Sequence, residues 1–244
     1  MRQPLAAVRE RGMPALLFTA ATILPTILPH GYRRYEPIMD ITPAAHNPVA
    51  ALPFAESTPL GLLGLAVGCA ALVPIAFGHS LTPAGLRTAA MFCLLFGAGG
   101  QFLAGMMALA NKNMLGGTLF TTFSFNWVMN WWALSGLAEG RAPDPTIVLS
   151  VDITFLVVFV VLTYAFGFHS KLLFAFLADI DLLFAARIAK ELTHAQPLGL
   201  VVACCTVALI GIALWLAFAI LVNPVAGRPV FAVSGPLFHA KIAQ

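Results

Sequence analysis

Charged residues are scarce in this chain. Asp, Glu, Lys and Arg make up 9% of its 244 residues, against roughly a quarter in an ordinary soluble domain. The net charge of +3 is spread along the sequence, so neither a nucleic-acid surface nor a polybasic lipid site is indicated. Hydrophobic residues, in contrast, reach 60%. This composition excludes an ordinary soluble domain and predicts an integral membrane protein.

Catalytic and cofactor-binding motifs are also lacking. The stretch "GAGGQF", Gly97 to Phe102, begins like a dinucleotide-binding loop, but it has no third glycine and follows no predicted strand. The sequence contains no GxSxG, no HExxH and no Walker loop. We therefore expect neither enzyme activity nor a bound cofactor.

Metal-binding and disulfide patterns are absent as well. The cysteines lie in apolar stretches without CxxC spacing, so we interpret them as small core residues. Most histidines lie at the ends of apolar stretches or in the tails, where packing near lipid headgroups explains them. The cysteines are Cys69, Cys93, Cys204 and Cys205, and the histidines are His30, His46, His79, His169, His194 and His239.

The apolar residues are grouped into windows of membrane-spanning length. A bilayer core about 30 Å thick needs roughly 20 mainly apolar residues per helical span. The windows predict six helices, joined by short loops into one all-α transmembrane bundle over residues 58–223, with a cytoplasmic tail at 224–244. The predicted spans are Pro59–Phe77, Thr88–Leu109, Thr118–Leu137, Thr146–Phe168, Leu172–Ala189 and Leu198–Val222.

The first 57 residues do not fit this pattern. Met13 to Pro29 is apolar and follows three arginines, as in a secretory signal, but no A-x-A site follows it. Its prolines also shorten any helix below spanning length. We interpret residues 1–57 as a cytoplasmic or interfacial segment, with a seventh span or a signal sequence as alternatives. Of the 13 Lys and Arg, nine then lie on the same side of the membrane as the two termini and four on the other side. This distribution favours cytoplasmic termini in the cell (inner) membrane.

Small residues mark the predicted packing faces of the first two spans. Gly61, Gly64 and Gly68 recur in the first, and Gly97, Gly100, Ala104 and Gly105 in the second, at spacings that allow close backbone approach. Gln101 lies on the same face. Its amide could bond to a neighbouring helix or to a solute, and both interpretations remain open.

A polar stripe follows the third span. Thr118, Thr122, Asn126 and Asn130 recur every four residues, and two amides in one row favour contact with a solute or pore slightly over helix–helix bonding. The aromatic pair Phe123 and Trp127 has the same spacing, which suits either a constriction or core packing.

Two acidic residues lie in the fifth span. An ionised carboxylate near mid-membrane needs a partner, water or a proton, so Asp179 and Asp181 are candidates for proton coupling. Residues two apart on a helix point roughly 200° apart, so at most one of them can face a given pore. Arg187 follows in the same span.

The region from Phe96 to Trp127 resembles the acetate uptake transporter family, the succinate-acetate permease group. The resemblance is carried by "FGAGGQFLAG" and "KNMLGGTLFTTFSFNW", with weaker support from "PLGL", Pro59 to Leu62, and from Gly227-Arg228. It covers residues 56 to about 236. We identify the chain as a divergent member, because several motif positions differ.

This resemblance implies six helices per protomer, a homo-hexamer, and one path through each protomer for acetate and related monocarboxylates, with proton symport or passive flow. It also implies path residues by position. Those lining the path would be Pro59, Leu60, Gly61, Leu62, Gln101, Asn113 and Thr118, with Leu65, Phe123 and Ile180 at a constriction, alongside the stripe residues Thr122, Asn126 and Trp127.

Three functions remain open from the sequence. A transporter or channel for small monocarboxylates is the leading hypothesis. Asp179 and Asp181 flank the inferred constriction and would repel an anion unless protonated or paired, which suits ammonia, urea or small amides better. A membrane sensor that does not transport, with residues 1–57 binding its partner, is the third.

Overall fold

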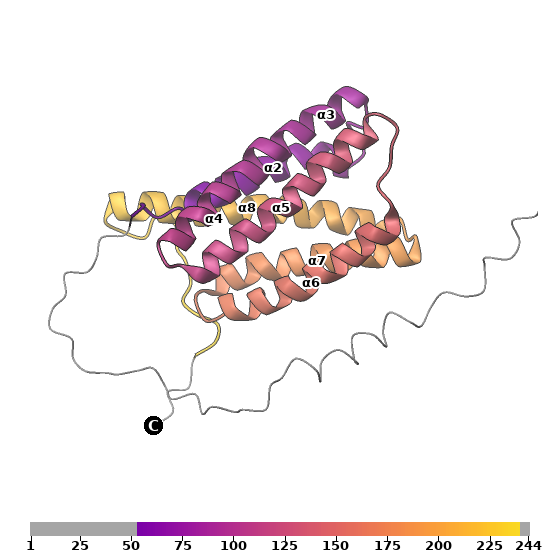
Figure 1. The fold of residues 1–244 in the computed structure, drawn as a ribbon. Helices are drawn as coiled ribbons and strands as arrows, with labels where there is room; N and C mark the ends of the chain where they lie inside the picture. The colour runs from indigo at the N-terminus through magenta and orange to yellow at the C-terminus, as the bar shows by residue number, and fades with distance from the viewer. Residues whose placement is uncertain (1–52, 240–244) are drawn as a thin grey trace, which may run out of the picture. The chain divides into compact units, whose positions relative to one another are not determined.

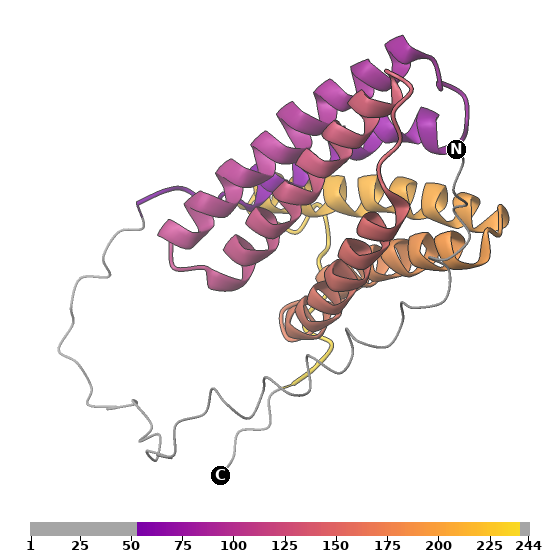
Figure 2. The ribbon, with the colours of Figure 1, turned by 45° about the vertical axis from the view of Figure 1, so that its right-hand side comes forward.

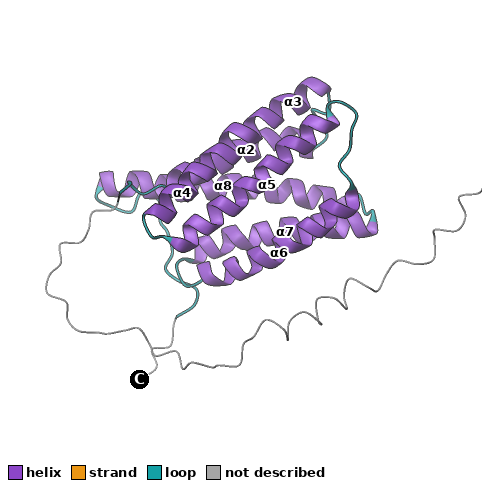
Figure 3. Cartoon of the chain, viewed as in Figure 1, coloured by secondary structure: helices purple, strands orange, loops and turns teal. Residues whose placement is uncertain are grey.

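The computed structural model describes residues 53–239, so the predictions for residues 1–52 lie outside the described part of the chain. Within it every regular element is helical (Figure 3). The elements are α2 (Thr58–Ala76), α3 (Pro83–Phe92), η2 (Cys93–Gly100), α4 (Gln101–Ala110), α5 (Met114–Leu137), α6 (Pro145–Phe166), α7 (Lys171–Thr193) and α8 (Pro197–Ala226).

The second predicted span is one continuous helix from Pro83 to Ala110, in which α3, η2 and α4 follow without a break. Its middle eight residues, Cys93–Gly100, are wound as a π-helix and include the glycines of "FGAGG". A π segment of this kind is rare and is often found at functional sites. It ends where Gln101 begins α4.

Local sequence signals explain where the helices begin. Proline occupies an early position in α2, α3, α6 and α8, where its missing N–H costs no hydrogen bond. Thr82, Asn113, Asp144 and Ser170 cap α3, α5, α6 and α7 through side-chain oxygens that accept backbone N–H groups.

Six helical rods therefore correspond to the six predicted spans, with ends that differ by a few residues. Four of them, α2, Pro83–Ala110, α6 and α8, are long and apolar enough to cross a membrane. The amides and hydroxyls of α5 and the charges of α7 keep these two rods below that level.

The helices pack with α8 in contact with both α2 and α7 (Figures 1 and 2). The helix Pro83–Ala110 packs between α2 and α5, and α6 packs on α7. Contact between α5 and α6 is made by side chains, for example Phe123 against Phe159 with ring centroids 5.1 Å apart.

Glycine allows the closest of these approaches. A Cβ built on Gly64 of α2 would lie 2.5 Å from the backbone oxygen of Phe96 in η2. A Cβ on Gly97 would lie 2.4 Å from the indole of Trp127. The small-residue faces predicted from the sequence are therefore helix contacts, and they bring Trp127 toward the bundle interior.

The residues after α8 return to the bundle. The side chain of Asn223 exchanges two hydrogen bonds with Phe231, at 2.8 and 2.9 Å. The backbone N–H groups of Leu237 and Phe238 donate to the oxygen of Gly167 at the α6–α7 corner, at 2.8 and 3.0 Å. This part of the predicted tail is thus bonded to the helices.

Candidate functional site

A cavity of about 340 Å³ lies at the end of the bundle where α2, α5 and α7 finish and α8 begins. Its polar lining comes from Asn126 and Asn130 of α5, Arg187 and Lys190 of α7, and Thr206 of α8. We call it the Arg187 cavity. Small-molecule sites start at about 300 Å³, so the cavity can hold a small solute.

An ion pair holds Arg187 at the wall of this cavity. Its Nε lies 3.1 Å from Oδ2 of Asp152 on α6. The Asp152 side chain is 6% exposed and that of Arg187 29% exposed, so the cation is the more accessible partner. The guanidinium also lies 5.5 Å from the ring centroid of Phe184, within the range of a cation–π contact.

A second cavity, of about 370 Å³, lies toward the opposite end, where α2, α5 and α7 begin. Its polar lining is Glu56, Thr58, Asn113 and His169. We call it the Asn113 cavity. Asn113 has a structural duty there as well, because its Oδ1 accepts the N–H of Gly116 at 3.0 Å and caps α5.

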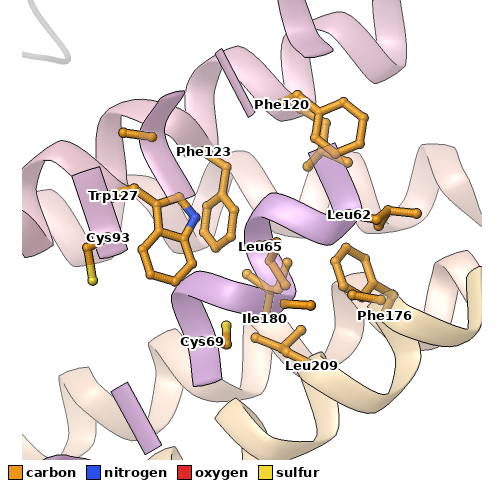
Figure 4. Packing of buried hydrophobic residues seen from close by; sticks show 14 of the residues in the cluster. Leu62, Leu65, Cys69, Cys93, Phe120, Phe123, Trp127, Phe176, Ile180 and Leu209 are labelled. Carbon is orange, nitrogen blue, oxygen red and sulfur yellow. The ribbon is translucent and has the colours of Figure 1, made fainter. Parts of the chain in front are cut away.

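An apolar layer separates the two cavities. Leu65, Phe123, Ile180 and Leu209 meet there from α2, α5, α7 and α8, and each is nearly inaccessible (Figure 4). On α2 the lining passes from Leu62 in one cavity to Cys69 in the other, and on α5 from Phe120 to Phe123. At about 1.5 Å per residue, the layer is roughly 5 to 10 Å thick.

Two cavities thus lie on either side of a thin apolar layer to which α2, α5, α7 and α8 contribute. A comparison with solved structures finds a chain of the same fold. The fold is that of the bacterial acetate channel SatP. The TM-score is 0.67, and the similarity covers 74% of this chain and 99% of SatP at 20% sequence identity.

The TM-score establishes the shared fold, and a sequence identity of 20% does not establish a shared function. Neither a family model nor a curated protein matches this chain. At the level of the fold, the similarity to SatP agrees with the resemblance seen in the sequence.

Gln101 is buried in the bundle, and its Oε1 has no hydrogen-bond partner. It lines neither the Arg187 cavity nor the Asn113 cavity. The Nε1 of Trp127 is also buried without a partner, although its ring lines the Arg187 cavity. An unpaired buried polar group costs roughly 1–3 kcal/mol, so both atoms require a physical reason.

The predicted polar stripe of α5 divides between faces. Thr118 is exposed, Thr122 is half-buried, and Asn126 and Asn130 line the Arg187 cavity. The amide of Asn130 donates to the backbone oxygen of Asn126 at 3.0 Å. Because the stripe drifts around α5, its amides Asn126 and Asn130 line the cavity and its hydroxyls Thr118 and Thr122 do not.

The "PLGL" stretch lies at the start of α2. Pro59 is buried, and Leu60 is 41% exposed on the outside of the helix. Gly61 is buried against the ring of Phe120, where a Cβ would come within 2.6 Å, and Leu62 lines the Asn113 cavity.

Neither predicted aspartate lines either cavity. Oδ2 of Asp181 accepts a hydrogen bond of 2.7 Å from Thr163 on α6. Asp179 lies beside Cys205 of α8, and its Oδ2 is buried without a hydrogen-bond partner. The two side chains thus contact different helices, as their spacing on α7 requires.

Sequence reasoning missed Asp152, Lys190 and Thr206. Asp152 is the single charged residue in the apolar span Thr146–Phe168. This position could have identified it, because a charged group within a membrane span needs a partner. Arg187 in the next span is that partner. Thr206 carried no signal, because a lone threonine in an apolar helix commonly bonds to its own backbone, here to Val202 at 2.8 Å.

Proposed function

We propose that this protein conducts acetate and related small monocarboxylates across a membrane, through the Arg187 cavity, the apolar layer and the Asn113 cavity. The observation that carries the proposal is the alignment of these parts within α2, α5, α7 and α8. The similarity to the acetate channel SatP supports it. No covalent chemistry is part of the proposal, and all six rods would span the membrane.

The charges at the Arg187 cavity favour an anion over a neutral or weakly basic solute. Arg187 and Lys190 line one cavity, while Asp179 and Asp181 line neither. The aspartates and the amide stripe of α5 were the two reasons to consider ammonia, urea or amides. The first reason weakens because both aspartates contact neighbouring helices.

The apolar layer would select by size and by dehydration. A solute leaving the amides of Asn126 and Asn130 meets Phe123, Leu65 and Ile180, which offer it no hydrogen bond. A small carboxylate or its acid, with one methyl group, can cross a layer of roughly 5 to 10 Å between two polar linings. An ion loses much more hydration energy there than a neutral solute, so the acid would cross at lower cost than the carboxylate.

Membrane orientation and proton coupling belong to the same proposal. With both termini cytoplasmic, the Asn113 cavity would open inward and the Arg187 cavity outward. Asp179 and Asp181 are both candidates for proton coupling, because each has one buried carboxylate oxygen without a hydrogen-bond partner. If coupling uses Asp179, Asp179→Asn abolishes the pH dependence of uptake; an unchanged pH profile contradicts this role.

The homo-hexamer remains an expectation, to be tested by mass measurement in detergent.

The decisive experiment uses the full chain in sealed lipid vesicles. Labelled acetate exchange above that of empty vesicles, with little competition from urea, is expected. Exchange that urea inhibits as strongly as acetate does would favour the path for neutral solutes. No exchange at any pH would leave the sensor hypothesis, which deletion of residues 1–50 then tests.

A blocking variant links the flux to the passage. Asn130→Cys, reacted with a bulky thiol reagent, should stop exchange because Asn130 lines the Arg187 cavity. Val128→Cys is the matched control, two residues away on α5 and 37% exposed outside the cavity. The untreated and the treated native chain provide the baseline for the four native thiols.

A further inference from the structure

We propose that Arg187 binds the carboxylate group of the solute in the Arg187 cavity, so that this cavity selects anions before the apolar layer selects by size. This inference rests on the proposed passage and names the residue that gives it charge selectivity. A guanidinium binds a carboxylate through parallel N–H groups, which matches the chemistry of a monocarboxylate.

Arg187 retains free donors for such a ligand. Asp152 lies at its Nε, on one edge of the guanidinium. Within residues 53–239, the ion pair is made through Nε, and neither terminal nitrogen donates a hydrogen bond. A guanidinium has five N–H donors, so these nitrogens can serve a second carboxylate while the first holds the side chain in place.

The negative partner is set back from the cavity. Asp152 is buried and is not part of the cavity lining, whereas Arg187 and the face of Phe184 are. The pair is thus oriented with its positive end toward the solute. Glu191, the other acid near Asp152, is exposed and also lies outside the lining.

Lys190 supports this field from the rim. It lines the same cavity one turn further along α7, near Gly199 at the start of α8, but it is exposed and screened by salt. Glu56 is the charged side chain in the lining of the Asn113 cavity, where His169 is the other titratable group. The two ends of the passage therefore differ in sign, and the anion site belongs to the Arg187 end.

The experiment compares acetate with acetamide, its neutral counterpart, in vesicles containing the full chain. Arg187→Gln alone would leave Asp152 buried and unpaired, which can prevent folding. The main variant is therefore the double change Arg187→Gln with Asp152→Asn, which removes both charges. Arg141→Gln is the matched control, because Arg141 follows α5 at the same end, is also paired with a carboxylate, Glu139, and does not line this cavity.

We expect the double variant to lower acetate exchange at low salt by about tenfold. Acetamide exchange, which we expect to be slower than acetate exchange in the native chain, should stay at its native rate. Native exchange should fall between 0.01 and 0.15 M salt, as the screening length falls from about 30 to 8 Å, and the variant should lose most of this dependence. Arg187→Lys should be intermediate, since an ammonium keeps the charge but not the fork. Arg141→Gln should behave as the native protein.

A binding measurement separates the two levels of the proposal. Acetate should protect Asn130→Cys from the thiol reagent, and the double variant should lose this protection. If the native chain binds and exchanges acetate but the double variant does so equally well at all salt concentrations, the role of Arg187 is refuted while the passage stands. If acetate protects Asn130→Cys but no exchange occurs, the anion site stands and the passage is refuted. Absence of both refutes both.

Discussion

The contact between Gly64 and η2 gives a sharp test of the packing that frames the passage. A Cβ at Gly64 would lie 2.5 Å from the Phe96 oxygen and 3.4 Å from the Cα of Gly100. An ordinary carbon–oxygen contact is about 3.3 Å or longer, so Gly64→Ala must move two backbones apart by roughly 0.8 Å. Overpacking of this kind costs typically about 1–3 kcal/mol.

The control is the same substitution where space is open. A Cβ at Gly211 of α8 would meet nothing within 4 Å. Both substitutions gain about 0.5–1 kcal/mol from removing a helical glycine, so their difference isolates the contact. At roughly 2–4 °C per kcal/mol, Gly64→Ala should unfold about 2–12 °C below Gly211→Ala in a thermal scan in detergent.

The functional consequence follows from the neighbouring residue. Leu65 belongs to the apolar layer, so a shift of α2 against η2 should also change acetate exchange, whereas Gly211→Ala should leave it unaltered. Equal unfolding midpoints for the two variants would refute the close approach of α2 and η2. An altered midpoint with unaltered exchange would instead refute the part of Leu65 in the layer.

Two further predictions concern the passage. Phe123→Ala removes the ring that packs on Phe159 and Trp127, at a cost of about 3–5 kcal/mol. It should raise the exchange of larger monocarboxylates relative to acetate, and Phe123→Leu is the milder variant. An unchanged ratio of the two exchange rates in both variants would contradict the role of Phe123 in the apolar layer. Gln101→Leu removes the unpaired Oε1 and should stabilise the protein by about 1–3 kcal/mol in thermal scans. Exchange should be unaltered because Gln101 lines neither cavity, and a fall in exchange would contradict that placement.

The hydropathy of the sequence predicts where the six rods lie, and four of them are long and apolar enough to cross a membrane. The predicted spans and the observed helices agree within a few residues, and the longer observed ends carry residues such as Arg87 and Lys190 that lower a hydropathy average. The π winding of η2 has no such signal. Its residues Phe96 and Gly97 lie in close contact with Gly64 of α2 and Trp127 of α5, which are tertiary contacts that a single span of sequence does not show.

The cavity lining was predictable only in part. Asn126 and Asn130 stand out because amides are rare in apolar helices, and both line the Arg187 cavity. Thr118 shares their spacing but is exposed, since a four-residue repeat drifts around a helix of about 3.6 residues per turn. Asn113 is explained first as the cap of α5, a duty that spacing alone does not distinguish from solute binding.

Charged residues of α6 and α7 have partners on neighbouring helices, and these pairings, which the sequence does not show, decide which charge lines the cavity. Taken along α7 alone, Asp179 and Asp181 argue against an anion path. Across the bundle, Thr163 donates to Asp181 and Asp152 holds Arg187, so an acid on α6 presents a base on α7 to the cavity. The net effect of these membrane charges on a solute therefore depends on which member of each pair is accessible. In this fold the accessible member is Arg187, and that exposure supports the proposed carboxylate solute.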